Sequence, residues 1–262
     1  MEIKILKKGH YTLRLQIDGV SHTYVNALRR ICMAEVPTLA IDTVMVEENN
    51  TLMYDEIISH RLGLIPLKTD LDILVPRSRC SCEYGCPNCT VIYKTEKKGP
   101  GTLYSNELVP DHPELTPVYD NIPITKLTED QSLKFEAYAV LGISKHHSKW
   151  QPALSMYKNM PKIEITKDCD NCKICIDACP KKLFKEHDNK VIVENIELCT
   201  MCKSCTEACP KNAIKLSSIP DSFIFTVESF GSLSPDRIIQ KAIEVLSEKI
   251  DSFKEEFEKA SP

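Results

Sequence analysis

A cysteine pattern that occurs twice is the strongest constraint on this chain. Cys-x2-Cys-x2-Cys-x3-Cys-Pro lies within residues 168–180 and again within residues 198–210. This spacing is typical of two-cluster bacterial-type ferredoxins, in which the fourth cysteine of each run binds the cluster of the other run. The spacing therefore predicts two [4Fe–4S] ligand sets: Cys169, Cys172, Cys175 and Cys209 for the first cluster, and Cys199, Cys202, Cys205 and Cys179 for the second.

Two other uses of these eight cysteines are open, namely a pair of four-cysteine zinc sites and a disulfide framework. Zinc sites usually combine two separated Cys-x2-Cys pairs, whereas each run here is a triplet followed by Cys-Pro. The iron–sulfur interpretation is therefore preferred, although the motif does not say what the clusters are for.

A second group of cysteines lies within ten residues and is made of Cys80, Cys82, Cys86 and Cys89. Four thiolates so close in sequence can surround one tetrahedral ion, and Gly85 permits the tight turn that this needs. The pattern predicts a zinc site. A reduced loop without metal is the alternative.

Composition is that of an ordinary soluble globular protein. Of the 262 residues, 42% are hydrophobic and 27% are charged, which is typical of such proteins. The net charge of -4 argues against a large nucleic-acid-binding surface, because such domains usually carry a basic stripe. Neither a signal peptide nor an apolar run of bilayer-spanning length is recognisable. Cysteines grouped for metal binding suit a reducing cytoplasm.

Two segments have the apolar periodicity of helices. In Val20–Val36 the apolar face holds Val25, Leu28, Cys32 and Val36, with Ser21 or Thr23 as the cap and Pro37 as the stop. Asn26, Arg29 and Arg30 lie on or beside the edge of this face. From spacing alone, these arginines belong to a solvated surface.

The second helix is predicted over Pro235–Glu258, with Ser234 as its cap and a length of about 36 Å. Packing against its own domain and pairing with another subunit both explain so long an apolar stripe. The stripe consists of Ile239, Ala242, Leu246, Ile250, Phe253 and Phe257.

Strand-like segments are predicted at both ends of the chain and in its middle. The two cysteine runs lie between strand-like Ala153–Thr166 and Ser222–Glu228, so they look like an insertion in a hairpin. Lys97–Pro123 contains five prolines and two glycines, and this composition predicts a surface loop outside the core. The remaining predicted strands are two within Met1–Asp18, then Leu39–Glu48 and Leu133–Leu141.

Several motifs in order resemble one family of RNA polymerase subunits. They are Asn26–Arg30 (NALRR) with Val36-Pro37, Asp55–Pro66 (DEIISHRLGLIP), Lys145–Trp150 (KHHSKW) and Glu228–Pro235 (ESFGSLSP). The family includes the D subunit of archaeal DNA-directed RNA polymerase, the bacterial alpha subunit and the eukaryotic third-largest subunit.

This resemblance implies an α+β fold with three parts. A discontinuous dimerisation domain with two long helices and a sheet would consist of residues 1–41, 153–166 and 220–262. Residues 42–152 would form an inserted second α+β domain that carries the Cys80–Cys89 loop. Residues 167–219 would form a ferredoxin-like insertion with two [4Fe–4S] clusters.

The resemblance also implies a non-catalytic assembly subunit in the cytoplasm that pairs with subunit L. It would be a platform for the two large catalytic subunits and for subunits N and P, without sequence-specific nucleic-acid contacts. The alternative is a ferredoxin-type electron-transfer subunit of a redox enzyme. Apart from the resemblance, eight thiolates in a segment with a modest apolar core, Asp168–Pro210, predict that the clusters of the polymerase subunit are structural and make its assembly sensitive to oxygen. The implied interface residues are Asn26, Leu28, Arg29 and Arg30 in the first helix and Ile239, Ala242, Leu246, Ile250, Phe253 and Phe257 in the second.

Overall fold

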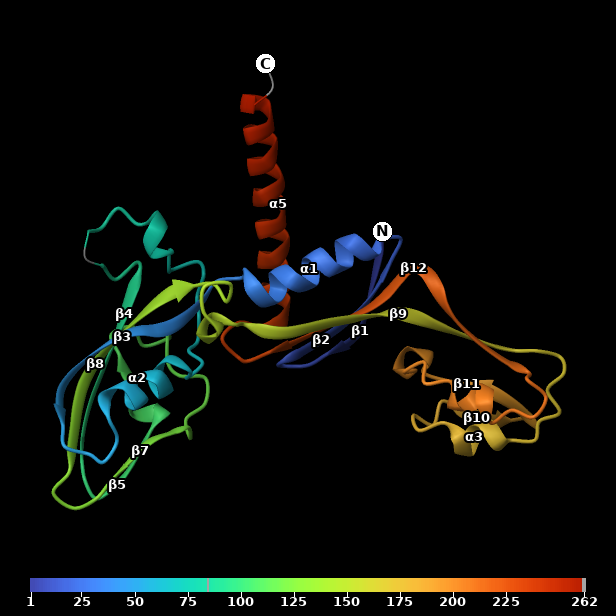
Figure 1. The fold of residues 1–262 in the computed structure, drawn as a ribbon, viewed down its shortest axis with the longest axis horizontal. Coiled ribbons are helices and arrows are strands. Elements are labelled where there is room, and N and C mark those ends of the chain that lie inside the picture. Colours follow the sequence, from blue (N-terminus) through green and yellow to red (C-terminus); the bar gives the residue numbers. More distant parts are fainter. Residues whose placement is uncertain (84, 261–262) are drawn as a thin grey trace. The chain divides into compact units, whose positions relative to one another are not determined.

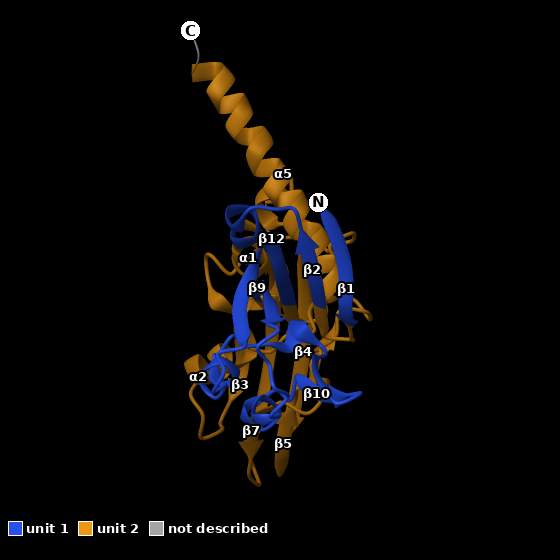
Figure 2. Cartoon of the chain, turned by 90° about the vertical axis from the view of Figure 1, so that its right-hand side faces the viewer, with its two compact units in different colours: residues 1–7, 14–26, 156–226 blue, residues 8–13, 27–155, 227–262 orange. Residues whose placement is uncertain are grey.

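The computed structural model describes residues 1–83 and 85–260, and this part of the chain divides into two compact units (Figure 2). Unit 1 contains residues 1–7, 14–26 and 156–226, and unit 2 contains residues 8–13, 27–155 and 227–262. Helices and antiparallel sheets occur together, which confirms the α+β class. The three-domain division made from the sequence stays a prediction.

The elements carry the labels of Figure 1. The helices are α1 (His22–Ala34), α2 (Asp55–Gly63), α3 (Ile174–Ala178), α4 (Ser204–Glu207) and α5 (Pro235–Ala260). The strands are β1 (Glu2–Lys8), β2 (Thr12–Asp18), β3 (Thr38–Asn49), β4 (Thr90–Lys98), β5 (Gly101–Tyr104), β6 (Val109–Pro110), β7 (Pro123–Leu127), β8 (Ser132–Gly142), β9 (Ala153–Ile165), β10 (Phe184–His187), β11 (Lys190–Val193) and β12 (Ile214–Ser229).

One four-stranded sheet joins segments that are far apart in the sequence, in the order β1-β2-β12-β9. Its strand β2 buries every second residue, as expected for a strand with one covered face. Strands β9 and β12 are neighbours in this sheet. The cysteine runs therefore leave and re-enter the sheet between two adjacent strands, as the sequence predicts.

Helix α1 begins after Ser21, whose hydroxyl accepts a hydrogen bond from the backbone N–H of Tyr24 at 3.2 Å. This contact satisfies one of the N–H groups that every helix start leaves without an intrahelical partner. The predicted apolar face, Val25, Leu28, Cys32 and Val36, is buried throughout. The helix ends at Ala34, two residues before the predicted end.

The second large sheet has the order β3-β8-β4-β6 and carries the core of unit 2. Strand β8 is paired on both sides, so Ala139 lies opposite Ile41 of β3 and Val91 of β4. Helix α2 packs beside this sheet and contributes Ile58 and Leu62 to the same core (Figure 1).

The prediction that Lys97–Pro123 is a surface loop outside the core is wrong. This segment contains β5 and β6, and Leu103, Leu108 and Leu115 are each at most 2% exposed. Prolines and glycines lie at one end of each short strand, but they do not prevent single apolar residues between them from reaching the core. Composition alone therefore missed three core leucines.

Candidate metal centres and partner interface

The two cysteine runs fold as a structural repeat with an offset of thirty residues. Lys173 and Lys203 both have positive φ angles, 65° and 66°, and each directly precedes a short helix, α3 or α4. Asn171 and Met201 are also left-handed, at 57° and 55°. These left-handed residues turn the backbone sharply between successive cysteines, so that each run wraps a small space.

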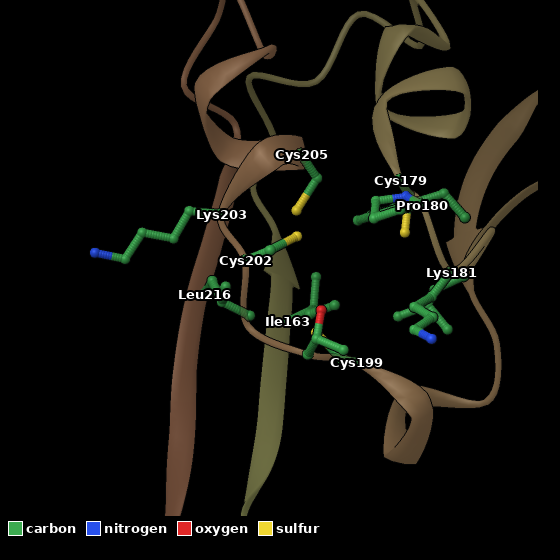
Figure 3. A pocket seen from close by; sticks show the side chains of 12 residues that line it. Ile163, Cys179, Pro180, Lys181, Cys199, Cys202, Lys203, Cys205 and Leu216 are labelled. Carbon is green, nitrogen blue, oxygen red and sulfur yellow. The ribbon is translucent and has the colours of Figure 1, made fainter.

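Each predicted ligand set lines its own small pocket. The first site contains Cys169, Cys172, Cys175 and Cys209. The second site contains Cys199, Cys202, Cys205 and Cys179, and Figure 3 shows these four side chains gathered around one space. The grouping agrees with the spacing rule for two-cluster ferredoxins, in which the fourth cysteine crosses over. Metal binding at both sites stays a prediction.

Donor chemistry at both sites suits an iron–sulfur cluster. Backbone N–H groups donate to thiol sulfur atoms, Met201 N to Cys199 Sγ and Ala213 N to Cys209 Sγ, each at 3.4 Å. Such contacts are among the features that tune cluster potentials. The apolar side chains of Ile163, Leu183 and Leu216 line the second site together with the thiols.

Burial and the crowding of the thiols raise the pKa of two of these cysteines, Cys175 and Cys205. Burial raises the pKa of Cys175, and the nearby thiols of the same set, Cys169, Cys172 and Cys209, raise it further. Burial and the nearby thiols of Cys179, Cys199 and Cys202 raise the pKa of Cys205 in the same way. Four thiolates crowded in one small space repel one another unless positive charge lies between them. Iron bound at these sites would supply that charge and bind the thiolate form.

The Cys80–Cys89 loop holds its four sulfur atoms at the spacing of a zinc site. All four lie within 4.8 Å of one another, and the pairs Cys80–Cys86, Cys82–Cys89 and Cys86–Cys89 are 3.6, 3.4 and 3.9 Å apart. Zn–S bonds of about 2.3 Å in a tetrahedron place sulfur atoms roughly 3.8 Å apart. The cysteines therefore fit a single Zn²⁺ ion.

The backbone of this loop supports the same arrangement. Gly85 has a φ of +106°, and a Cβ at this position would lie 3.0 Å from Thr90 Oγ1, so the turn requires glycine. Burial would raise the pKa of Cys89, but hydrogen bonds from the Cys86 N–H, the Thr90 hydroxyl and the Cys82 thiol lower it to about 7. Cys89 is thus poised to bind a cation as the thiolate.

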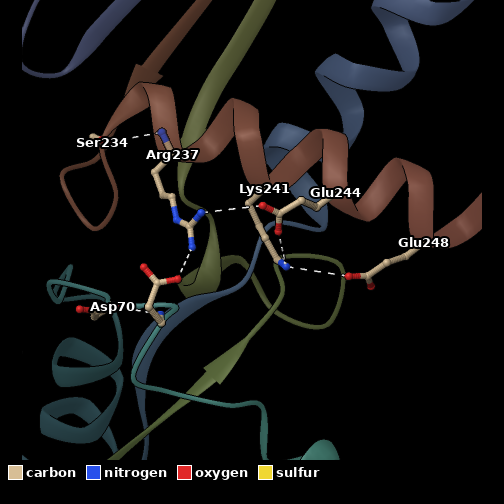
Figure 4. Close-up of polar contacts among 7 residues, drawn as sticks. Asp70, Ser234, Arg237, Lys241, Glu244 and Glu248 are labelled. Carbon is tan, nitrogen blue, oxygen red and sulfur yellow. Dashed lines mark hydrogen bonds and ion pairs between the residues drawn. The ribbon is translucent and has the colours of Figure 1, made fainter.

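Helix α5 begins at the predicted cap. The Ser234 hydroxyl accepts a hydrogen bond from the backbone N–H of Arg237 at 3.3 Å (Figure 4). The Arg237 guanidinium forms an ion pair with Asp72 at 2.6 Å. Farther along the helix, Lys241 pairs with Glu244 at 2.8 Å. The Arg237–Asp72 ion pair and the buried side chains of Ile238 and Ala242 fix the first half of the helix against the rest of unit 2.

The second half of α5 is exposed over residues 247–260. Three apolar side chains of the predicted stripe lie here, and Ile250, Phe253 and Phe257 are 59, 72 and 63% exposed. The two phenylalanine rings stack with their centroids 6.3 Å apart. This set, the α5 apolar face, is a surface on which a partner could pack.

The other predicted interface residues differ in how far they are exposed to solvent. Leu28 and Ala242 are buried within the chain, so the core already uses their surface. Asn26, Arg29, Ile239 and Leu246 are half-buried, and Arg30 is exposed. Ile243 was not among the predicted interface residues, although it is 47% exposed and lies seven residues before Ile250. The helical period could have identified it.

Comparison with known proteins decides the family. The RNA polymerase Rpb3/Rpb11 dimerisation domain matches residues 14–250. The chain belongs to this family. The match includes α1, the cysteine runs and most of α5, so the resemblance predicted from the short motifs is confirmed.

Members of the Rpb3/Rpb11 family from archaea are similar to the chain over nearly its full length. The DNA-directed RNA polymerase subunit Rpo3 of Methanothermobacter thermautotrophicus is 42% identical, over 96% of this chain and 97% of that protein. The subunit of the same name from Archaeoglobus fulgidus is 41% identical, over 95% of this chain and 95% of that protein. The one from Pyrococcus horikoshii is 38% identical, over 99% of this chain and 98% of that protein.

These names agree with the expectation of a polymerase component rather than a free-standing enzyme. Within residues 1–83 and 85–260, none of the helices combines the length and the apolar run that crossing a membrane would need.

Proposed function

We propose that this chain is the non-catalytic assembly subunit of a DNA-directed RNA polymerase and that it pairs with a smaller subunit, L, through helices α1 and α5. The observation that carries the proposal is the α5 apolar face. It lies at the end of a 26-residue helix whose last fourteen residues are all exposed. The names of the archaeal relatives support the same role.

Energetics favour a partner for this face. Fully burying a side chain such as Ile250 or Phe253 contributes roughly 1.5–3 kcal/mol, because apolar surface leaves water. The alternation of three- and four-residue steps suits a second helix lying along α5. In a complex with subunit L, the exposed side of α1 with Arg30 would remain available to the two large catalytic subunits, and subunits N and P would complete the platform.

The metal sites have a structural part in this proposal. Half of the buried core residues of the cysteine-rich segment are themselves cysteines, namely Cys175, Cys179, Cys199 and Cys205. A segment with so small an apolar core gains folding free energy from metal–ligand bonds. We infer that two [4Fe–4S] clusters and one zinc ion stabilise the subunit, and that loss of the clusters to oxygen weakens assembly.

Electron transfer as the main function is less well supported. It accounts for the eight clustered cysteines alone, whereas the family match extends from residue 14 to residue 250. A redox subunit would also leave the α5 apolar face unexplained.

The experiment is co-expression with subunit L and size-exclusion chromatography. Phe253→Asp with Phe257→Asp should abolish the heterodimer, because each carboxylate would be buried without a partner. Both side chains are exposed in the chain alone, so its own fold should persist. Ser252→Asp, on the opposite side of the helix, should leave pairing intact. A normal heterodimer from the double variant would overturn the proposed interface.

A further inference from the structure

We propose that the two cluster sites are electrostatically unequal and that the second site has the more positive reduction potential. The inference rests on the proposal that both cysteine sets bind [4Fe–4S] clusters. It concerns the charged side chains around each set, which the thirty-residue repeat allows to be compared position by position.

Two cations line the second site. Lys181 and Lys203 line it, no carboxylate side chain belongs to its described lining, and neither lysine forms an ion pair in residues 1–83 and 85–260. Lys181 also lines an adjoining groove together with Lys158 and Arg14. These two residues are likewise without an ion pair in the same part of the chain.

Lys158 and Arg14 are held directly against the loop that begins the second run. Lys158 Nζ donates a hydrogen bond to the backbone carbonyl of Cys199 at 2.5 Å. Arg14 Nη2 donates to the carbonyl of Glu197 at 3.1 Å. The two cations come from strands β9 and β2, so the sheet places fixed positive charge beside one cluster ligand.

At the first site, the equivalent charges are largely cancelled. Asp170 lines this site, and its carboxylate accepts a hydrogen bond from the Cys172 N–H at 3.2 Å. The equivalent residue in the second run is Thr200. Lys173, the equivalent of Lys203, is paired with Glu186 at 2.6 Å. Lys211 is the remaining cation in the lining.

This difference has a direct electrostatic consequence. A [4Fe–4S] cluster with four thiolates carries a net negative charge, and reduction adds one electron without forming or breaking a bond. Nearby cations therefore stabilise the reduced form more than the oxidised form, and a nearby carboxylate does the opposite. The second cluster should accept an electron from a low-potential one-electron donor before the first cluster does.

The test is a redox titration of the full-length chain, purified without oxygen, with dithionite as the reductant and electron paramagnetic resonance as the readout. Iron content is measured on every sample. Replacing Cys169, Cys172 and Cys175 by serine leaves the second site alone, and replacing Cys199, Cys202 and Cys205 leaves the first. These two variants assign the signals, and the second site should show the more positive midpoint.

Exchanging the equivalent residues tests the cause. Thr200→Asp should shift the midpoint of the second site to a more negative value, and Asp170→Thr should shift that of the first site to a more positive value. Lys158→Met should lower the midpoint of the second site. Lys4→Met, an exposed lysine on β1 outside both cavities, is the control and should shift neither.

Equal midpoints in an iron-filled chain, a reversed order, or exchange variants without shifts would overturn the inequality. Because Thr200 and Asp170 do not hold the Cys199 carbonyl, the exchange remains decisive if Lys158→Met fails to fold. A chain that binds no iron at either set would instead overturn the cluster proposal itself, so the two failures are distinguishable.

Discussion

The Tyr93 hydroxyl donates a hydrogen bond to the backbone carbonyl of Leu115 inside the core of unit 2. Burial raises the pKa of Tyr93 far above its ordinary value, so the phenol is neutral and remains a donor. The contact fixes a proline-rich segment to the central sheet.

Tyr93→Phe should therefore lower the free energy of unfolding by about 1–3 kcal/mol, because the buried Leu115 carbonyl loses its partner. Urea denaturation at matched metal content measures this. Tyr119→Phe, at a tyrosine that is 39% exposed, should change stability by no more than about 0.5 kcal/mol. Equal effects of the two substitutions would contradict a stabilising role for the Tyr93 hydrogen bond.

Leu103 provides a second test of the same segment. It is fully buried, and Leu103→Ala should cost about 2–5 kcal/mol through lost contacts and the cavity left behind. Val109 lies six residues farther along and is 63% exposed, so Val109→Ala should have little effect. If the two variants unfold at the same urea concentration, the segment is not part of the core.

The sequence predicted elements whose signals are local. The buried face of α1 and the Ser234 cap of α5 follow from spacing within one short segment. The grouping of each cysteine set follows from a short spacing pattern that occurs twice. Strand β12 begins at Ile214, eight residues before the predicted start at Ser222, because Pro220 makes its first part look unlike a strand.

Contacts between distant segments were not predictable in this way. Lys158 and Arg14 reach the Cys199 loop only because β9 and β2 belong to one sheet. Nothing in the local sequence around either residue indicates this contact. The core position of Leu115 likewise depends on Tyr93, more than twenty residues away.

Zinc binding by the Cys80–Cys89 loop can be tested by Cys86→Ser. Losing one of four thiolates should remove the zinc while leaving the iron unchanged, because the two kinds of site share no ligand. Elemental analysis by mass spectrometry measures the zinc and iron contents of the variant. Cys32→Ala, which removes a cysteine outside all three groups, should retain zinc and iron. A full zinc content in Cys86→Ser would refute the four-cysteine site.

Cys32 should make stability depend on alkaline pH. Burial raises the pKa of this thiol from 9.0 to about 12. The contribution of Cys32 to the free energy of unfolding is complete below pH 9, where the thiol is neutral in the folded and the unfolded state. It is lost as the pH rises towards about 12, because the unfolded state ionises first. The stability advantage over Cys32→Ala should shrink by about 1.4 kcal/mol per pH unit in this interval. Parallel unfolding curves for both proteins would argue against a buried thiol.

The central claim is that this chain is built into an RNA polymerase and carries its clusters there. The most direct measurement is anaerobic affinity purification of the tagged chain from its native cells, with co-purifying chains, iron and zinc quantified together. We expect subunit L and the two large catalytic subunits in the eluate, with on the order of eight iron atoms per chain. Recovery of the chain with a redox enzyme and without polymerase subunits would contradict the claim.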